Sequence, residues 1–351
     1  MATPSSTELL QVAAFTAGQF VPGARLRVRQ YLPVLARLGV NVLETFPRLG
    51  AYPPSQRWLR PLWACLSITE RMPAVFYARN ADVVLLQREM LSSFVTLEPF
   101  ARKPRVLDVD DAIFLKRDGR AARRLAQLSD RVICGNDYLA DWFSVWNRDV
   151  AIIPTAVDTQ RLVPSLQSGT PKEGARVIGW VGTSGNLRYL SAIVPALEAV
   201  VEHLGDVMIR VVSDIAPDLG AVANRFVEFI PWSPEVEVSS IQGMDVGIMP
   251  LEDSSWERGK CSYKMLQYMA CGIACVVSPV GMNAQVLAMG DVGISAKSAS
   301  QWADALVYLL ESESARRAMG TVGRSVVEAS FSLDVLAPRL AAALRGVAVS
   351  P

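Results

Sequence analysis

The hydrophobic pattern of the chain alternates between short apolar runs and longer runs in which apolar residues recur every three or four positions. Short apolar runs bounded by Gly, Pro or Asp are typical of strands buried in a parallel sheet, and the longer period is typical of helices. The runs predict strands at residues 9–15, 40–43, 82–87, 105–108, 130–135, 150–154, 176–181, 207–213, 227–230, 246–249 and 274–278. This alternation indicates an α/β fold.

The longer pattern predicts helices at residues 26–38, 136–146, 262–271, 302–310, 315–330 and 333–347. A chain of 351 residues exceeds one ordinary domain and predicts two. The stretch PSLQSGTPKEGA is rich in Pro, Gly and Ser and reads as a linker. We therefore expect a first domain at residues 1–165, a linker at 166–175, a second domain at 176–330 and a C-terminal helix within 331–351.

The stretch from Trp256 to Asp291 carries the most specific chemistry. We expect a loop at 256–261, followed by a helix that Ser262 caps, because its hydroxyl can accept from free backbone N–H groups. Lys260 and Lys264 are four residues apart, on one helical face if the helix begins slightly early. A helix N-terminus attracts anions, so this segment predicts a diphosphate site. The alternative is two solvated lysines beside a core helix.

Two glycine-bearing loops follow predicted strands. The loop after the strand at 176–181 offers backbone N–H groups and hydroxyls that can cradle a phosphate, from Gly182, Thr183, Ser184 and Asn186. The loop at 16–23 contains Gly18 and Gly23, which let a ligand approach the backbone closely, although such loops are common. Neither has the dinucleotide spacing G-x-G-x-x-G, so a nicotinamide dehydrogenase is poorly supported.

Three carboxylates, Asp108, Asp110 and Asp111, stand at the carboxyl end of the strand predicted at 105–108. In open α/β sheets this edge lines the ligand crevice, so these groups are candidates for contact with a substrate. The alternative is a solvated acidic turn.

Composition and charge exclude several classes of function. A net charge of +1 implies no nucleic-acid partner, and the single histidine, His203, excludes a histidine triad. The five cysteines match no zinc spacing, and we expect no metal site and free thiols in a reducing cytoplasm. No signal peptide is evident at the N-terminus.

The first half of the chain is basic. Residues 1–165 hold 21 basic and 15 acidic residues, and residues 52–72 mix Arg with Trp and Leu. This pattern is typical of a helix at a membrane interface, and it is equally typical of ordinary packing and surface charge.

The segment around the lysine-bearing helix resembles the donor-binding segment of group 1 glycosyltransferases (glycosyltransferase family 4). The matching residues are Lys264, Gln267, Met269 to Ile273, Val276 to Ser278 and Val280-Gly281. The run IIPTAVDTQRL and the pair Asp110-Asp111 resemble further segments of that family.

The resemblance implies a GT-B fold, with two Rossmann-like domains facing across a cleft. It implies transfer of a sugar from a nucleotide diphosphate sugar to a hydroxyl of a glycan, lipid-linked or small-molecule acceptor, with retention at the anomeric carbon. No metal or cofactor is implied, the donor being a substrate. We expect a cytoplasmic protein, with a peripheral contact at the inner membrane face as a further expectation.

The resemblance also implies roles for individual residues. Asp110 and Asp111 would orient the acceptor hydroxyl or act as base, and Lys264 would stabilise the departing diphosphate. The implied donor-binding residues are Gly182, Thr183, Ser184, Asn186, Trp232, Trp256, Lys260, Ser262, Lys264 and Gln267. Gly18, Gly23 and Arg25 would form the loop at the cleft floor.

The chain departs from the family at two glutamates eight residues apart, where it has Gly259 and Gln267. Gln267 can still bind the ribose hydroxyls, whereas Gly259 would need Trp256, Glu257 or Lys260 to take its role beside the sugar. This departure leaves two other functions open. One is a nucleotide-sugar-binding partner protein without turnover, and the other is a nucleotide-sugar epimerase or phosphorylase on the same fold.

Overall fold

The computed structural model describes residues 9–19, 21–50, 53–165, 174–221 and 223–348. Packing divides the chain into two compact units. The first comprises residues 1–156, 259–261 and 333–351, and the second comprises 157–258 and 262–332. Most of the expected linker, residues 166–173, lies outside the described residues. The boundary between the units falls between Ala156 and Val157, before the expected position, because residues 157–163 are hydrogen-bonded within the second unit.

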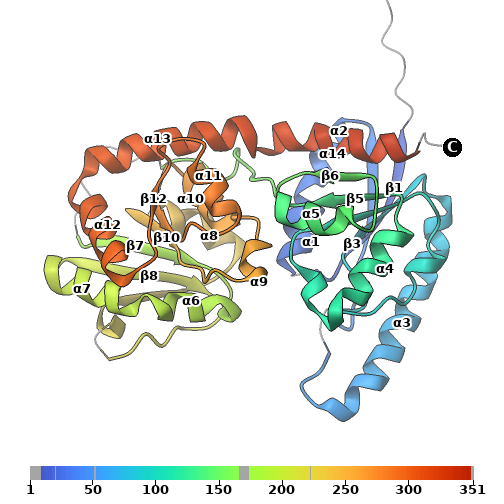
Figure 1. Ribbon diagram of the computed structural model, residues 1–351, viewed down its shortest axis with the longest axis horizontal. Helices are drawn as coiled ribbons and strands as arrows, with labels where there is room; N and C mark the ends of the chain where they lie inside the picture. The colour runs from blue at the N-terminus through green and yellow to red at the C-terminus, as the bar shows by residue number, and fades with distance from the viewer. Residues whose placement is uncertain (1–8, 20, 51–52, 166–173, 222, 349–351) are drawn as a thin grey trace, which may run out of the picture. The chain divides into compact units, whose positions relative to one another are not determined.

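The first unit is built on a six-stranded parallel sheet in the order β2-β1-β3-β4-β5-β6 (Figure 1). Its strands are β1 (Leu10–Phe15), β2 (Val40–Thr45), β3 (Val83–Gln87), β4 (Arg105–Val109), β5 (Arg131–Cys134) and β6 (Val150–Ile152). All six predicted strands are present. Strand β3 is buried along its whole length, which is why its first four residues read as a continuous apolar run. Strand β4 is equally buried, and its charged residues Arg105 and Asp108 are hydrogen-bonded within the unit.

Helices cover this sheet. They are α1 (Pro22–Arg27), α2 (Leu32–Arg37), α3 (Arg60–Tyr77), α4 (Arg120–Leu128), α5 (Asp137–Ser144) and α14 (Leu333–Ala348). Helix α14 shares the hydrophobic core of the first unit, since Leu336, Leu340 and Leu344 pack with residues of β1, β3 and α2.

The single helix expected at 26–38 was wrong in its bounds. The structure has α1, a 3-10 turn at Arg29–Tyr31 and then α2. Pro22 and Pro33 each lie in the first turn of a helix, where the missing N–H group of proline costs nothing, so each proline favours a new helix start. Gly23 and Arg25 consequently lie in α1 and not in a loop.

The second unit is built on another six-stranded parallel sheet, in the order β12-β11-β10-β7-β8-β9 (Figure 1). Its strands are β7 (Arg176–Val181), β8 (Val207–Ser213), β9 (Val227–Pro231), β10 (Val246–Met249), β11 (Ala274–Val277) and β12 (Ile294–Ser295). The five strands predicted here are confirmed, and β12 was not predicted. Trp180 and Trp302 are among the largest side chains of the core.

The helices of the second unit are α6 (Leu187–Ala192), α7 (Val194–Leu204), α8 (Pro234–Gln242), α9 (Ser255–Arg258), α10 (Tyr263–Ala270), α11 (Met282–Leu287), α12 (Ala299–Glu311) and α13 (Glu313–Ser330). The loop expected at 256–261 was wrong in part, because α9 occupies its first half. Helix α9 forms where buried Glu257 bonds to side chains of α6 and to Ser254. Across the described ranges, we find no helix long and apolar enough to cross a membrane.

Strand order reverses once in each sheet, between β1 and β3 in the first unit and between β7 and β10 in the second. In open α/β sheets, ligands bind beyond the carboxyl ends of the strands at such a reversal. A ligand is therefore expected at the carboxyl end of β3 in the first unit, and at Gly182, just after β7, in the second.

Candidate functional site

Of the three carboxylates at the end of β4, Asp108 has a structural partner. It is buried and accepts two hydrogen bonds from Arg27 of α1, from Nε at 3.0 Å and from Nη2 at 2.5 Å. Burial alone would lower the pKa of Arg27, but the charge and hydrogen bonds of Asp108 raise it overall, so the guanidinium stays charged. Arg27 also donates to the carbonyl oxygen of Ile153 at 2.9 Å, and the pair thereby joins α1, β4 and the end of β6.

Asp111 forms an ion pair with Arg88. Its Oδ2 accepts from Arg88 Nη1 at 3.1 Å, and its side chain is 27% exposed. Burial and the charge of Asp110 raise the pKa of Asp111 to about 6, while Arg88 and Lys260 act in the opposite direction. Asp111 can therefore gain or lose a proton near neutral pH, as general acid–base catalysis requires.

Asp110 lies beside a glutamine that sequence reasoning missed. Gln87, the last residue of β3, is 1% exposed, and within the described part of the chain neither of its amide atoms has a hydrogen-bond partner. Asp110 Oδ1 is likewise buried without a partner there. A Cβ atom on Gly23 would lie 2.8 Å from Gln87 Nε2 and 3.1 Å from Asp110 Oδ2. The side chains of Gln87 and Asp110 thus converge where only glycine leaves room. Each carries a buried polar atom without a partner within the described residues, although buried polar atoms ordinarily have partners.

Gly18 is buried in the loop after β1, and Arg25 lies one turn into α1. Both follow β1, whose end flanks the strand reversal. Their expected contact with a ligand stays a prediction.

The segment Gly259–Cys261 packs with the first unit. Asn136 Nδ2 donates to the Lys260 carbonyl oxygen at 3.1 Å, and Cys261 Sγ lies 3.3 Å from the Asp110 carbonyl oxygen. A Cβ atom on Gly259 would lie 2.8 Å from Ala112 Cβ. The place of the family's first glutamate therefore has no room for a side chain.

The expectation that Lys260 and Lys264 share a helical face was wrong. Helix α10 begins at Tyr263, so Lys264 lies in its first turn and Lys260 lies outside the helix. Lys260 also packs with the first unit, whereas Lys264 packs with the second.

Ser262 does not cap α10 with its side chain, which corrects a second expectation. Its backbone is left-handed, with φ of 54°, and its hydroxyl donates to Asn283 Oδ1 at 2.5 Å. Asn283 in turn donates to the Ser278 carbonyl oxygen at 3.0 Å. The serine thus ties the start of α10 to the start of α11 and leaves the first-turn N–H groups to other partners.

Lys264 lies against the glycine turn after β7. A Cβ atom on Gly182 would lie 2.8 Å from Lys264 Cε and 2.6 Å from the Trp180 ring, so a larger residue would displace both side chains. Lys264 Nζ lies 5.4 Å from the centroid of the Trp180 ring. The structure therefore brings together two features that the sequence indicated separately, the lysine and the glycine turn.

The polar residues after Gly182 are engaged within the protein. The Ser184 backbone N–H and hydroxyl donate to Asp214 at 2.6 and 2.8 Å, and Asn186 Nδ2 donates to Thr183 Oγ1 at 3.0 Å. A phosphate that took these donors from Ser184 would have to displace the Asp214 carboxylate, and the expected contact stays a prediction.

Gln267 is only 2% exposed, and its Nε2 has no hydrogen-bond partner within the described ranges. A buried amide donor without a partner is suited to bind a ligand oxygen.

Trp232, just after β9, donates from Nε1 to Glu237 Oε1 at 3.2 Å. Trp256 lies on α9 and is half-buried.

Glu257, one of the residues considered in place of the missing glutamate, is buried and engaged. It accepts from the Tyr189 hydroxyl, from Arg188 Nη2 at 3.0 Å and from the Ser254 hydroxyl. These bonds fix α9 against α6, so Glu257 has a positioning role in this structure.

Four further residues at these sites escaped sequence reasoning: Gln87, Arg27, Asp214 and Asn283. Gln87 had a usable signal, since it is a polar residue at the carboxyl end of an apolar strand, as Asp108 is. The others are ordinary polar residues whose partners lie far along the chain. In the part of the chain that the structure describes, no group of three or more His, Cys, Asp or Glu residues is placed to hold a metal ion.

Residues 175–312 match the family model described as "Glycosyl transferases group 1". A D-inositol 3-phosphate glycosyltransferase of Corynebacterium urealyticum is 26% identical over 197 residues, which is 48% of this chain and 45% of that protein. The chain thus matches less than half the length of this curated relative.

Solved structures resemble the chain over nearly its whole length. Sucrose-phosphate synthase from Thermosynechococcus elongatus superimposes with a TM-score of 0.71 and 15% identity, covering 96% of this chain and 98% of that one. HepE from Anabaena, in complex with UDP and glucose, superimposes with a TM-score of 0.68 and 14% identity. The match covers 96% of this chain and 100% of the HepE chain. WaaG, a glycosyltransferase involved in lipopolysaccharide biosynthesis, superimposes with a TM-score of 0.67 and 15% identity. The match covers 95% of this chain and 100% of the WaaG chain. These findings confirm the resemblance to the group 1 glycosyltransferases, whose family model covers residues 175–312, and they give the chain the GT-B fold.

Proposed function

We propose that the protein transfers a sugar from a nucleotide diphosphate sugar to a hydroxyl acceptor, with retention at the anomeric carbon and without a metal. The observation that carries the proposal is the match of residues 175–312 to the group 1 glycosyltransferases, within which Lys264 lies against Gly182 at the carboxyl end of β7. The HepE structure with UDP and glucose supports a nucleotide-sugar donor. We propose a glycan, lipid-linked or small-molecule acceptor and a cytoplasmic reaction.

In this proposal the departing diphosphate is stabilised by Lys264 and the first turn of α10. A fixed cation and helix N–H groups aimed at developing negative charge are ordinarily the largest contribution to catalysis, because they need no reorganisation during the reaction. Gly182 lets the diphosphate approach the backbone beside Lys264. Lys260, predicted as a second cation for the diphosphate, stays part of the proposal.

Gln267 would hold the ribose of the donor. Its buried Nε2 can donate a hydrogen bond to a ribose hydroxyl. The family's glutamate can only accept one from that hydroxyl when it is ionised. Trp232, just beyond β9, would contact the base, and Thr183, Ser184, Asn186, Trp256 and Ser262 remain proposed donor-binding residues.

The acceptor hydroxyl would bind at the cluster of Asp110, Gln87 and Gly23. The unpartnered amide of Gln87 can both donate to and accept from a hydroxyl, and Asp110 Oδ1 can accept its proton. At a pH above the pKa of Asp111, both Asp110 and Asp111 would be negatively charged. Gly18 and Arg25 would complete the acceptor side.

The pH dependence follows from Asp111. Because its pKa is raised to about 6, Asp111 is mostly protonated below pH 6 and ionised above it. We expect kcat/KM to rise with pH through about 6 and then level off, since the ionised Asp111 makes Asp110 a better acceptor of the hydroxyl proton. Asp111→Asn should remove this rising limb. A profile in which wild type and variant rise at the same pH would contradict the role of Asp111.

Nucleotide binding is tested by thermal shift with UDP, GDP, dTDP, ADP and CDP. At about 100 times its dissociation constant, a nucleotide stabilises its protein by roughly 2.7 kcal/mol. We expect one nucleotide to shift the wild type. We expect Lys264→Ala to weaken binding of that nucleotide about tenfold or more, because a charge-assisted hydrogen bond to the diphosphate is lost. Lys297→Ala removes an exposed lysine of the same unit and should leave the shift unchanged. No shift with any nucleotide would contradict the donor site.

Turnover separates transfer from the other two functions. With the nucleotide sugar that binds, transfer requires an added acceptor, an epimerase converts the donor alone, and a phosphorylase requires phosphate. A partner protein without turnover is favoured by one observation, the closed space at Gly259. A partner protein of this kind would still show a thermal shift with nucleotide, and Lys264→Ala would lose that shift. It would form no product with an added acceptor, with the donor alone or with phosphate.

A further inference from the structure

Helix α3 exposes the apolar side chains that a helix of a globular domain ordinarily buries. Its buried residues are Ser67, Arg71 and Val75, and Arg71 Nη2 donates to the Thr16 carbonyl oxygen at 2.9 Å. Its large exposed apolar residues are Leu62, Leu66, Met72, Phe76 and Tyr77, and Trp58 of the preceding 3-10 turn is exposed as well. Trp58 is 78% exposed and Phe76 is 54% exposed. The polarity of the helix is thus inverted relative to a helix that packs on a core.

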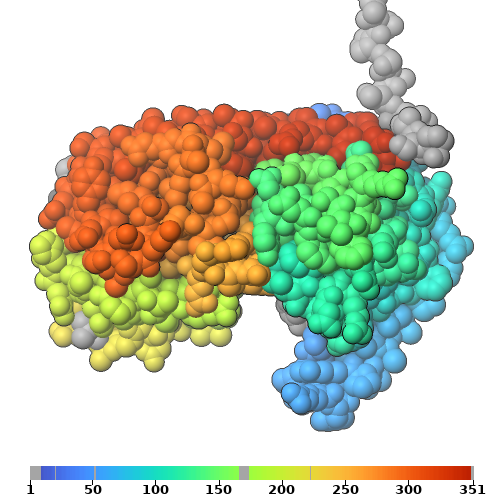
Figure 2. Space-filling view, in the orientation of Figure 1, coloured from blue at the N-terminus to red at the C-terminus, as the bar shows by residue number. Residues whose placement is uncertain are grey.

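The exposed residues form one continuous face. At 3.6 residues per turn these residues, with the exposed Cys65 and Thr69 among them, lie on the side of α3 opposite the buried Ser67, Arg71 and Val75. The helix forms a lobe that stands out from the rest of the first unit, as the light-blue surface in Figure 2 shows. An exposed apolar face of this extent marks an interaction site.

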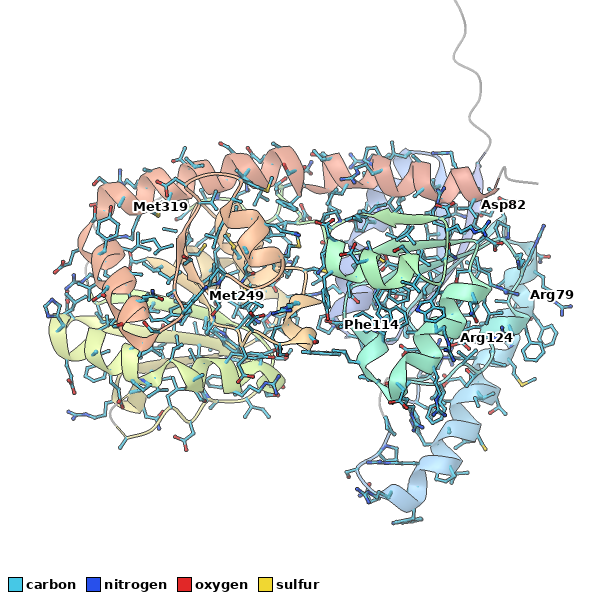
Figure 3. The ribbon with its side chains drawn as sticks, viewed as in Figure 1. Arg79, Asp82, Phe114, Arg124, Met249 and Met319 are labelled. Atoms are coloured by element: carbon cyan, nitrogen blue, oxygen red, sulfur yellow. The ribbon has the colours of Figure 1, made fainter. Side chains whose placement is uncertain are left out.

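Positive charge flanks the face. Arg57 and Arg60 are exposed at its beginning. Arg79 is exposed just past its end (Figure 3). The Arg79 guanidinium lies 4.8 Å from the centroid of the Phe76 ring. Between residues 53 and 80 the sequence has one acidic residue, Glu70. Glu70 is half-buried, and its carboxylate accepts the backbone N–H of Arg48 at 2.7 Å. The face is therefore apolar with a basic border.

We propose that α3 and the turn before it lie on an anionic lipid bilayer, with the apolar face in the boundary between headgroups and acyl chains. Trp, Leu and Phe suit that depth, and arginines at the border suit lipid phosphates. The lack of acidic side chains on the face complements a surface of negative charge. The proposal goes beyond sugar transfer, and lipid binding can be measured whether or not nucleotide binds.

The test uses flotation of the full chain with vesicles of phosphatidylcholine alone or mixed with phosphatidylglycerol. We expect binding to the anionic vesicles that weakens as salt is added. Arg57→Glu/Arg60→Glu should weaken binding by roughly 30-fold or more, since each lost arginine costs about fivefold near an anionic surface. Trp58→Gln/Leu62→Gln should weaken binding about tenfold or more, because two apolar side chains no longer leave water.

The matched control is Val145→Glu/Arg148→Glu, which changes an exposed apolar residue and an exposed arginine of the same unit away from α3. It should leave vesicle binding unchanged. Circular dichroism and thermal unfolding verify that each variant is folded, and the changed side chains are exposed, so we expect native stability.

Cys65 provides a direct probe of depth. It lies on the exposed face of α3, while the other four cysteines are buried. An environment-sensitive fluorophore on Cys65 should shift its emission to shorter wavelength with anionic vesicles. Equal binding to both vesicle types, no shift at Cys65, or full binding by the α3 variants would each overturn the proposal. A dimer that Trp58→Gln/Leu62→Gln dissolves, without vesicle binding, would identify the face as a contact between two copies and also overturn it.

Discussion

Asp110→Asn is expected to lower kcat by about 10²–10⁴-fold, the usual contribution of a positioned proton acceptor. The substitution keeps the size of the side chain and removes the charge next to the unpartnered amide of Gln87. We expect the fold to be retained, because the two side chains have the same shape and Asp110 Oδ1 has no hydrogen-bond partner within the described residues. Steady-state rates with saturating donor and varied acceptor measure the effect.

A second readout separates chemistry from structure. The charge of Asp110 raises the pKa of Asp111, so Asp110→Asn should move the acidic limb of the residual rate to lower pH. Asp118→Asn, an exposed aspartate of the same unit, is the control and should change neither rate nor profile. Full activity in Asp110→Asn would exclude this carboxylate as the proton acceptor.

Arg27→Met is expected to destabilise the first unit by about 3–5 kcal/mol. The buried carboxylate of Asp108 would lose its counter-charge and two hydrogen bonds while remaining out of water. An uncompensated buried charge costs several kcal/mol because water no longer solvates it. Scanning calorimetry should show a transition lowered by roughly 6–20 °C, given about 2–4 °C per kcal/mol for a domain of this size.

The double variant Arg27→Met/Asp108→Leu distinguishes the charge from packing. Replacing both partners by apolar side chains of similar volume leaves no buried charge, so most of the lost stability should return. A double variant less stable than Arg27→Met would show that shape and not charge dominates. Arg29→Met, two residues further along, is the control, because the Arg29 side chain is 30% exposed in its ion pair with Glu44.

The local pattern of the sequence determined most of the fold. Strands buried in parallel sheets consist largely of apolar runs, so β3, β10 and β11 could be located from hydrophobicity alone. The order lysine, helix, glycine, buried strand was specific enough to indicate the family, because it fixes three elements in sequence. Helix starts were less certain, since Pro22 and Pro33 divide what reads as a single helical period.

The tertiary structure alone decided which of these residues meet. Gln87 lies near Asp110 because β3 and β4 are neighbours in the sheet, and Arg27 meets Asp108 across 81 residues of sequence. Lys264 reaches Gly182 through the same kind of long-range packing, whereas Lys260, four residues earlier, packs with the first unit. Sequence periodicity encodes the local backbone, but strand order and side-chain burial determine these distances. The sequence therefore named the aspartates and the lysine, and the fold added the glutamine and showed that Asp108 is a structural residue.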